Sequence, residues 1–272
     1  MSNLAKRAIF GGLYVALILG ALLLGSPLLY MIVFGLIVFL GVWEWSNLVS
    51  THRTFPLRRI SDASAGVYLF WVTYMIAQGK AGHILLVPYA AYLLYVLVRS
   101  IYSERELMPT DLAKVFLGQI YVAGFMSVAN IFYSGLADSR LLLTIFVCIW
   151  VNDTGAYLAG STLGRHKLFP SVSPKKSWEG FAGGFIASVL VSGLMLGWEP
   201  LWLLFGAVIS VAGTWGDLFE SMIKRQVGVK DSGNIIPGHG GILDRIDSLL
   251  LVLPFTAFLL WVIHTYQYLH LS

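Results

Sequence analysis

The sequence predicts an all-α, polytopic integral membrane protein with about nine transmembrane helices and a cytoplasmic N-terminus. The 272-residue chain is 57% hydrophobic and only 12% charged, about half the charged fraction of ~25% in soluble domains. Its apolar residues form blocks of about 16–24 residues, long enough to cross ~30 Å of hydrocarbon. These blocks lack the polar stripes of helical period that a soluble helical fold requires.

Nine spans follow one another along the chain. They cover residues 8–25, 28–45, 63–79, 82–98, 113–135, 140–160, 180–197, 200–217 and 247–266. The first follows two cations, as a signal peptide would, but no clean small-residue cleavage pattern comes after it. We therefore expect a retained helix there. The third and fourth spans are short, and a re-entrant pair is the alternative for them.

The positive charges predict the orientation of the spans. With the N-terminus inside, 16 of the 18 Lys and Arg fall on the cytoplasmic side, the positive-inside pattern. Only Lys80 and Arg140 fall outside. This places the C-terminus outside and two large loops, 161–179 and 224–247, in the cytoplasm. We predict that 1–140 is a helical scaffold with surfaces for dimer and lipid contacts, and that 141–272 is the catalytic region.

Cysteine and charge exclude other classes. Cys148 is the only cysteine, so neither an intrachain disulfide nor a cysteine metal cluster is possible. It stands in an apolar run, where we expect a buried, inert thiol. The pI is near 9.1, but no block of basic residues predicts a nucleic-acid partner. The predicted location is an integral membrane one, the cell inner membrane if the source is bacterial.

Carboxylates within or beside the predicted spans mark a functional region. Asp153, Asp217 and Glu220 occupy such positions, where an ionisable group costs about 2.5–3.5 kcal/mol unless it faces a cavity or a partner. One helix face carries Asp217, Glu220, Ser221 and Lys224, at i, i+3, i+4 and i+7.

Asp244 and Asp247 repeat the i, i+3 spacing at the start of the last span. Converging carboxylates suit Mg²⁺, which shares its other ligand positions with phosphate oxygens and water. The alternative is a structural pairing of one intramembrane Asp with a Lys.

The stretch PGHGGILDRID precedes the last span. Its Gly238, Gly240 and Gly241 let the backbone approach a ligand, and a helix N-terminus offers N–H groups to an anion. An ordinary flexible loop is the alternative. No GxxxxGK[ST] motif occurs in the chain. The nearby cations are candidate phosphate ligands. They are Lys224, Arg225, Lys230 and Arg245.

The earlier loop contains SVSPKKSWEGFAGG. Lys175 and Lys176 are candidate phosphate ligands, with binding of anionic lipid head groups as the alternative. Ser177 is placed to cap the next helix. In the second loop, His239 is a candidate proton carrier or metal ligand, against the alternative of an ordinary hydrogen-bonding residue. No GxSxG motif supports a Ser–His–Asp hydrolase.

These residues resemble the signature of the phosphatidate cytidylyltransferases, or CDP-diacylglycerol synthases. The resemblance runs through SMIKR from Ser221, KDSG from Lys230 and PGHGGILDRID from Pro237, over 27 residues. DTGAY from Asp153, SPKKSWEG from Ser173 and the Gly216–Asp217 pair also resemble family landmarks. Residues 150–250 carry the likeness, and 1–140 match only as generic helices. Ser177 stands where the family often has threonine, so the hydroxyl is kept.

The resemblance implies that CTP and phosphatidate give CDP-diacylglycerol and pyrophosphate, that Mg²⁺ is required, and that the chain is a homodimer. It leaves a second cation open. Asp217 and Asp244 are the implied metal ligands. We assign Asp153, Glu220 and Asp247 as secondary ligands or as residues that orient the ligands. The basic residues named above, with Ser177, would hold phosphates, and Gly240 and Gly241 would approach the nucleotide.

Rival functions remain open at this stage. A polyprenol kinase that uses CTP, or a cytidylyltransferase for an ether lipid, would have a similar plan. An ion or anion transporter is the rival from another class; it would bind its ion through charges at the midplane and would show paired broken helices in two repeated halves. We expect almost no charges at depth in the first half.

Overall fold

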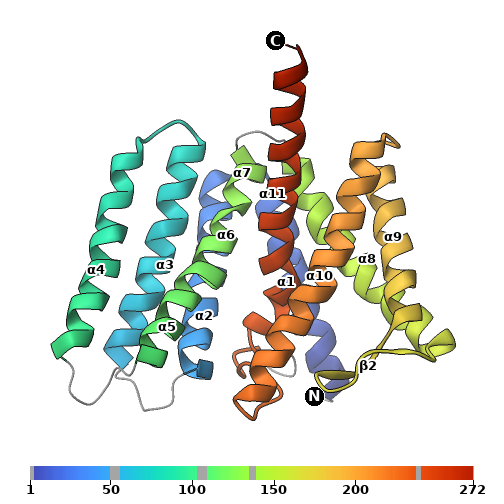
Figure 1. Cartoon of the computed structure of the whole chain (residues 1–272), viewed down its shortest axis with the longest axis horizontal. Coiled ribbons are helices and arrows are strands. Elements are labelled where there is room, and N and C mark those ends of the chain that lie inside the picture. Colours follow the sequence, from blue (N-terminus) through green and yellow to red (C-terminus); the bar gives the residue numbers. More distant parts are fainter. Residues whose placement is uncertain (1–2, 50–55, 103–108, 135–138, 237–239, 272) are drawn as a thin grey trace. The chain divides into compact units, whose positions relative to one another are not determined.

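The computed structural model describes residues 3–49, 56–102, 109–134, 139–236 and 240–271, and these are almost entirely helical (Figure 1). Eight helices within these ranges are long and apolar enough to cross a membrane. They cover Pro27–Val49, Leu57–Ala77, His83–Tyr102, Leu112–Tyr133, Ser139–Leu163, Trp178–Leu196, Pro200–Gln226 and Leu243–Gln267. The predicted class, an all-α polytopic membrane protein, is confirmed.

The first predicted span, 8–25, falls on a helix whose apolar part, Ile9–Leu23, is shorter than the other eight. The third and fourth are both long enough to cross, so their length does not require a re-entrant pair. Two predicted ends near the polar loop were wrong. The helix predicted to end at 217 continues to Gln226, and the last begins at Leu243 rather than 247. The polar loop is thus 227–242.

The chain forms two compact units, described separately here. The first comprises Met1–Leu136 and Val227–Arg245, and the second Ala137–Gln226 and Ile246–Ser272.

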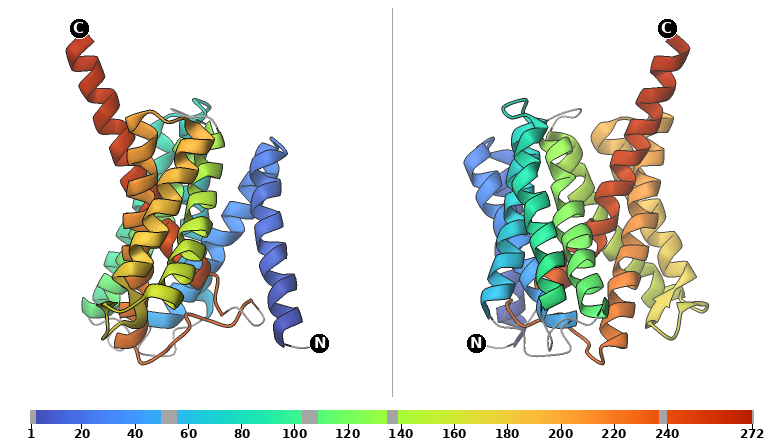
Figure 2. Two further views of the ribbon diagram at one scale, coloured as in Figure 1. Left: turned by 90° about the vertical axis from the view of Figure 1, so that its right-hand side faces the viewer. Right: turned by 60° about the vertical axis from the view of Figure 1, so that its left-hand side comes forward.

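The first unit is a helical bundle in which α3 packs against α2, α4, η2, α6 and α7 (Figure 2). Its elements are α1 (Asn3–Leu23), α2 (Pro27–Val49), α3 (Pro56–Ala77), η1 (His83–Leu86), α4 (Val87–Tyr102), α5 (Pro109–Gly118), η2 (Gln119–Gly124), α6 (Phe125–Ser127) and α7 (Ala129–Ser134). η2 is a π-helical turn. In the core, Tyr30 stacks on Tyr133 with ring centroids 3.8 Å apart.

Two carboxylates are buried in this unit, contrary to the expectation of almost none at depth in the first half. Glu44 is 2% exposed and Asp62 4% exposed. The Tyr92 hydroxyl donates to Asp62 Oδ1 over 2.6 Å, and Gln119 Nε2 donates to the Asp62 carbonyl over 2.9 Å. The hydrogen bond from Tyr92 makes the burial of the Asp62 carboxylate tolerable.

The second unit packs α8 (Ser139–Leu163), α9 (Trp178–Leu196) and α10 (Pro200–Gln226) against one another, with α11 (Leu243–Leu271) continuing into it (Figure 1). The predicted 161–179 loop contains an antiparallel hairpin of β1 (Lys167–Phe169) and β2 (Ser173–Ser177). Figure 2 shows this hairpin, in yellow, at the end of α8 where the chain turns into α9. Cys148 is buried, as predicted.

Small residues bring α8 and α9 into backbone contact. A Cβ added at Gly155 would lie 3.0 Å from the Gly183 carbonyl oxygen. One added at Gly184 would lie 2.7 Å from the Asn152 carbonyl oxygen and 2.8 Å from its Oδ1. Only glycine allows this separation, as is common where membrane helices cross closely. The contact fixes residues 152–160 of α8 beside the start of α9.

Candidate functional site

A cavity of about 490 Å³ lies within the second unit, where α8, the hairpin, α9 and α10 meet. It is within the range of 300–1,000 Å³ that is usual for ligand pockets. Five residues predicted for the site line it: Asp153, Lys175, Lys176, Ser177 and Asp217. The cavity therefore gathers candidate phosphate ligands and candidate metal ligands from separate parts of the sequence.

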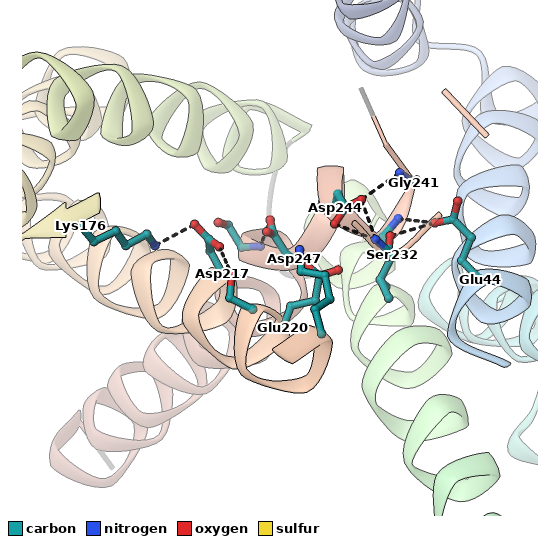
Figure 3. Close-up of polar contacts among 12 residues, drawn as sticks. Glu44, Lys176, Asp217, Glu220, Ser232, Gly241, Asp244 and Asp247 are labelled. Carbon is teal, nitrogen blue, oxygen red and sulfur yellow. Dashed lines mark hydrogen bonds and ion pairs between the residues drawn. The ribbon is translucent and has the colours of Figure 1, made fainter. Parts of the chain in front are cut away.

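Lys176 and Asp217 form an ion pair in the wall of this cavity (Figure 3). Lys176 Nζ lies 2.7 Å from Asp217 Oδ2, with side chains 26% and 35% exposed. Nζ also donates to the Thr214 carbonyl, one turn before Asp217, over 3.4 Å. The Ser221 hydroxyl donates to Asp217 Oδ1 over 3.1 Å. Both carboxylate oxygens thus have partners, yet the pair remains open to solvent.

The hairpin presents its lysines from a fixed base. Ser177 is the N-cap of α9, as predicted, and its hydroxyl accepts from Gly180 N over 3.1 Å. The Glu179 carboxylate accepts from the backbone N–H of Arg165 and His166 and lies 2.6 Å from His166 Nδ1. These contacts fasten the beginning and the end of the hairpin to the first turn of α9. Lys175 and Lys176 lie on β2, directly before that turn.

Glu220 and Lys224, which follow Asp217 on α10 by one and two turns, form a second ion pair. Lys224 Nζ lies 3.0 Å from Glu220 Oε2, and the side chains are 9% and 0% exposed. Both were predicted to contact ligands. In the structure they are buried against each other, and neither lines the cavity. Their ligand roles stay predictions.

Asp247 lies near the same face of α10. Gly216 permits this approach, because a Cβ there would lie 2.7 Å from the Asp247 carbonyl oxygen. The Asp247 carboxylate lies close enough to Asp217 and Glu220 for their negative charges to repel it (Figure 3). Two carboxylates, Asp217 and Asp247, are thus presented close together by neighbouring helices.

The described residues fit Mg²⁺ better than a metal that requires an all-protein cage. Among residues placed by the structure, no group of three or more His, Cys, Asp or Glu could hold a metal by itself. Mg²⁺ is ordinarily bound through one or two carboxylates, with phosphates and water as its other ligands. Asp217 and Asp247 are the candidates for such a pair; Asp217 and Asp153 line the cavity, whereas Asp247 is not among its lining residues.

Most of the remaining candidates belong to the first unit. The Asp244 carboxylate accepts from Gly241 N at 2.8 Å and from Ser232 N at 3.0 Å (Figure 3). Lys230 and Arg245 are exposed, and Gly240 has φ +84°, a conformation that favours glycine. Arg225, in the second unit, is also exposed. His239 lies outside the described residues.

Sequence reasoning missed several cavity residues. Asn152, Tyr157, Ser161, Lys167 and Thr214 also line the cavity. Helical spacing from Asp153 indicates Tyr157 and Ser161, because i+4 and i+8 share its face. Lys167 gave no such signal, since only the hairpin brings it to the cavity.

Comparison with known proteins identifies relatives. A family model described as "Cytidylyltransferase family" matches residues 5–263. The phosphatidate cytidylyltransferase of Staphylococcus haemolyticus (strain JCSC1435) is 43% identical over 169 residues, 59% of this chain and 64% of that protein. That of Staphylococcus aureus (strain COL) is 43% identical over 172 residues, 61% of this chain and 65% of that protein. The chain therefore matches slightly less than two thirds of the length of these relatives.

Proposed function

Because the chain belongs to the cytidylyltransferase family, we propose that it transfers the cytidylyl group of CTP to phosphatidate. The products are CDP-diacylglycerol and pyrophosphate. The observation that carries the proposal is the cavity of the second unit, in which the Lys176–Asp217 pair stands between apolar helices. Both substrates carry phosphate groups and one of them is a lipid, so their site would need cationic side chains beside apolar helices.

The cavity has the charge that two phosphate-bearing substrates require. Lys167, Lys175 and Lys176 line it, together with the first turn of α9 at Ser177 and Gly180. A helix N-terminus favours an anion through its N–H groups and its dipole. Lysine ammonium groups add point charges that bind phosphate oxygens. The apolar wall includes Phe181, which suits contact with a base or with lipid.

The reaction needs positioning more than proton transfer. A phosphate oxygen of phosphatidate attacks the α-phosphorus of CTP, a new P–O bond forms, and the bond to the β-phosphate bridging oxygen breaks, releasing pyrophosphate. The attacking oxygen is already anionic, so no general base is required. The lysines would hold the two anions together and stabilise the charge that develops on the leaving group.

We further propose that Mg²⁺ is bound by Asp217 and Asp247. When bound, it would supply charge neutralisation at the phosphate oxygens. In this structure Lys176 Nζ lies 2.7 Å from Asp217 Oδ2. Its ammonium group is thus placed to move from that carboxylate to a phosphate when substrates enter.

We also propose that the protein is a homodimer and that its active site faces the cytoplasm. The uneven distribution of Lys and Arg supports that orientation.

The test is an assay of purified protein in mixed micelles that contain phosphatidate and Mg²⁺. CTP labelled at the α-phosphate should transfer its label to lipid, and pyrophosphate should be released. Asp217→Ala and Lys176→Ala should abolish the transfer, whereas Lys80→Ala, which changes an exposed cation of the first unit, should not.

Absence of lipid labelling over a range of Mg²⁺ and lipid concentrations would refute the proposal. CTP labelled at the γ-phosphate, offered with a polyprenol, would then test for a kinase. An ether-lipid acceptor would test the related cytidylyl transfer, and uptake into liposomes would test a transporter.

A further inference from the structure

We propose that Glu44, on α2, is a positioning residue that holds the described parts of the segment 230–245, residues 230–236 and 240–245, in the geometry used for catalysis. The inference rests on the proposed function, because it assumes that this segment serves the reaction. Glu44 lies in the region predicted to be a helical scaffold with surfaces for dimer and lipid contacts, and its hydrogen-bond partners Ser232 and Leu243 lie 188 and 199 positions away in the sequence.

Glu44 binds the segment through its carboxylate (Figure 3). Glu44 Oε2 accepts from Leu243 N over 2.9 Å and from the Ser232 hydroxyl over 3.4 Å. The side chain is 2% exposed, so water competes little for these bonds. Hydrogen bonds to an ionised acceptor are about twice as strong as neutral ones. One side chain thus ties both ends of the 232–243 stretch to α2.

Asp244 completes the arrangement from the opposite side. Ser232 donates its backbone N–H to Asp244 and its hydroxyl to Glu44, so it links the two carboxylates. Gly241 N also donates to Asp244. Moving Glu44 would therefore release Ser232 and Leu243, and with them the contacts that orient Asp244.

The glycines of the segment fit closely around these carboxylates. A Cβ at Gly233 would lie 2.5 Å from Glu44 Oε1, and one at Gly241 would lie 2.7 Å from the same oxygen. A Cβ at Gly240 would lie 2.7 Å from Asp244 Oδ2. Close backbone approach to a ligand was the reason predicted from the sequence for Gly240 and Gly241. The structure adds a second reason, which is room for the carboxylates that hold the loop.

The experiment compares Glu44→Ala and Glu44→Gln with a matched control, Asp62→Asn. Asp62 is a buried carboxylate of the same unit, 4% exposed, whose carboxylate accepts from the Tyr92 hydroxyl and whose backbone carbonyl accepts from Gln119. Two kinds of measurement are made in micelles. The first gives kcat per folded molecule together with KM, and the second is amide hydrogen exchange of the peptide that covers 230–245.

For Glu44→Ala we expect kcat to fall on the order of 10²-fold, the effect of misplacing a catalytic group by about 1 Å. KM for CTP should change little, because the loss is confined to the transition state. Exchange of the Ser232 and Leu243 amides should accelerate. Glu44→Gln retains one acceptor oxygen and should fall between wild type and Glu44→Ala in both quantities. Asp62→Asn should leave both unchanged.

Wild-type kcat and wild-type exchange in Glu44→Ala would overturn the inference. Equal changes in Asp62→Asn would overturn it too, since they would show general damage to the unit. If the wild type labels no lipid, the proposed function fails. The exchange comparison then still decides whether Glu44 holds the segment.

Discussion

Removal of the Lys224 ammonium group should destabilise the protein strongly, because it leaves the Glu220 carboxylate buried without this partner. The two side chains are 9% and 0% exposed and their charged atoms lie 3.0 Å apart. Breaking a buried pair by removing one member costs about 3–5 kcal/mol, whereas an exposed pair contributes about 0–1 kcal/mol. At about 2–4 °C per kcal/mol, Lys224→Met should lower the apparent Tm by roughly 6–20 °C.

The assay is thermal unfolding of purified variants in one detergent at one scan rate, because membrane proteins often unfold irreversibly. Arg225→Met is the neighbouring control. Arg225 is exposed, so its loss should change stability by less than about 0.5 kcal/mol. The double variant Glu220→Met, Lys224→Met removes both charges. It should recover most of the lost stability, because apolar side chains often replace a buried pair at little cost.

An unchanged Tm in Lys224→Met would refute this reasoning and show that Lys224 does not stabilise the fold. If activity per folded molecule were then lost, the role of Lys224 as a phosphate ligand would gain support. A double variant no more stable than the single one would also contradict the account, because it would place the lost energy in some other contact.

Three further outcomes follow from the second unit. Gly184→Ala should destabilise the protein by about 1–3 kcal/mol through overpacking, since its Cβ would lie 2.7 Å from the Asn152 carbonyl oxygen. Thermal unfolding measures this loss, and unchanged stability would mean that α8 and α9 separate easily. Ser177→Ala should lose about 1 kcal/mol with its cap, while Ser177→Thr should retain it, as helicity and Tm will report. Lys176→Met should lose less than about 1 kcal/mol of stability because its pair with Asp217 is partly exposed, yet it should abolish transfer. A large drop in Tm with activity retained would reverse that assignment.

The spans were predictable because lipid imposes a length and an apolar composition on each of them. Their ends were less so. The prediction ended the helix at 217, where charges begin, but α10 continues to Gln226. Its polar face allows this, because Lys224 and Glu220 pair at i, i+4 along the helix. The prediction took the first charged residues as the end of the helix, whereas Lys224 and Glu220 neutralise each other inside the protein.

The site was predictable where residues lie in short motifs, and less so where folding brings distant residues together. Lys176 and Asp217 were both named as candidates, but their 2.7 Å contact depends on the hairpin and on α10. Glu44 was missed, although it stands within the predicted span 28–45 as a lone carboxylate. The rule that singled out Asp153 applied equally to it. Its partners, the Leu243 N–H and the Ser232 hydroxyl, lie 199 and 188 positions away in the sequence, and no short motif links them to Glu44.

The distance along the chain between Glu44 and Leu243 also bears on how the protein is made. Their hydrogen bond joins residues 199 positions apart. At about 5–20 residues per second, roughly 10–40 s pass between their syntheses. Throughout that time the nascent α2 carries a carboxylate whose donors, Ser232 and Leu243, do not yet exist. A chain cut short before Ser232 would keep Glu44 without either donor, which would make incomplete products less stable than the finished protein.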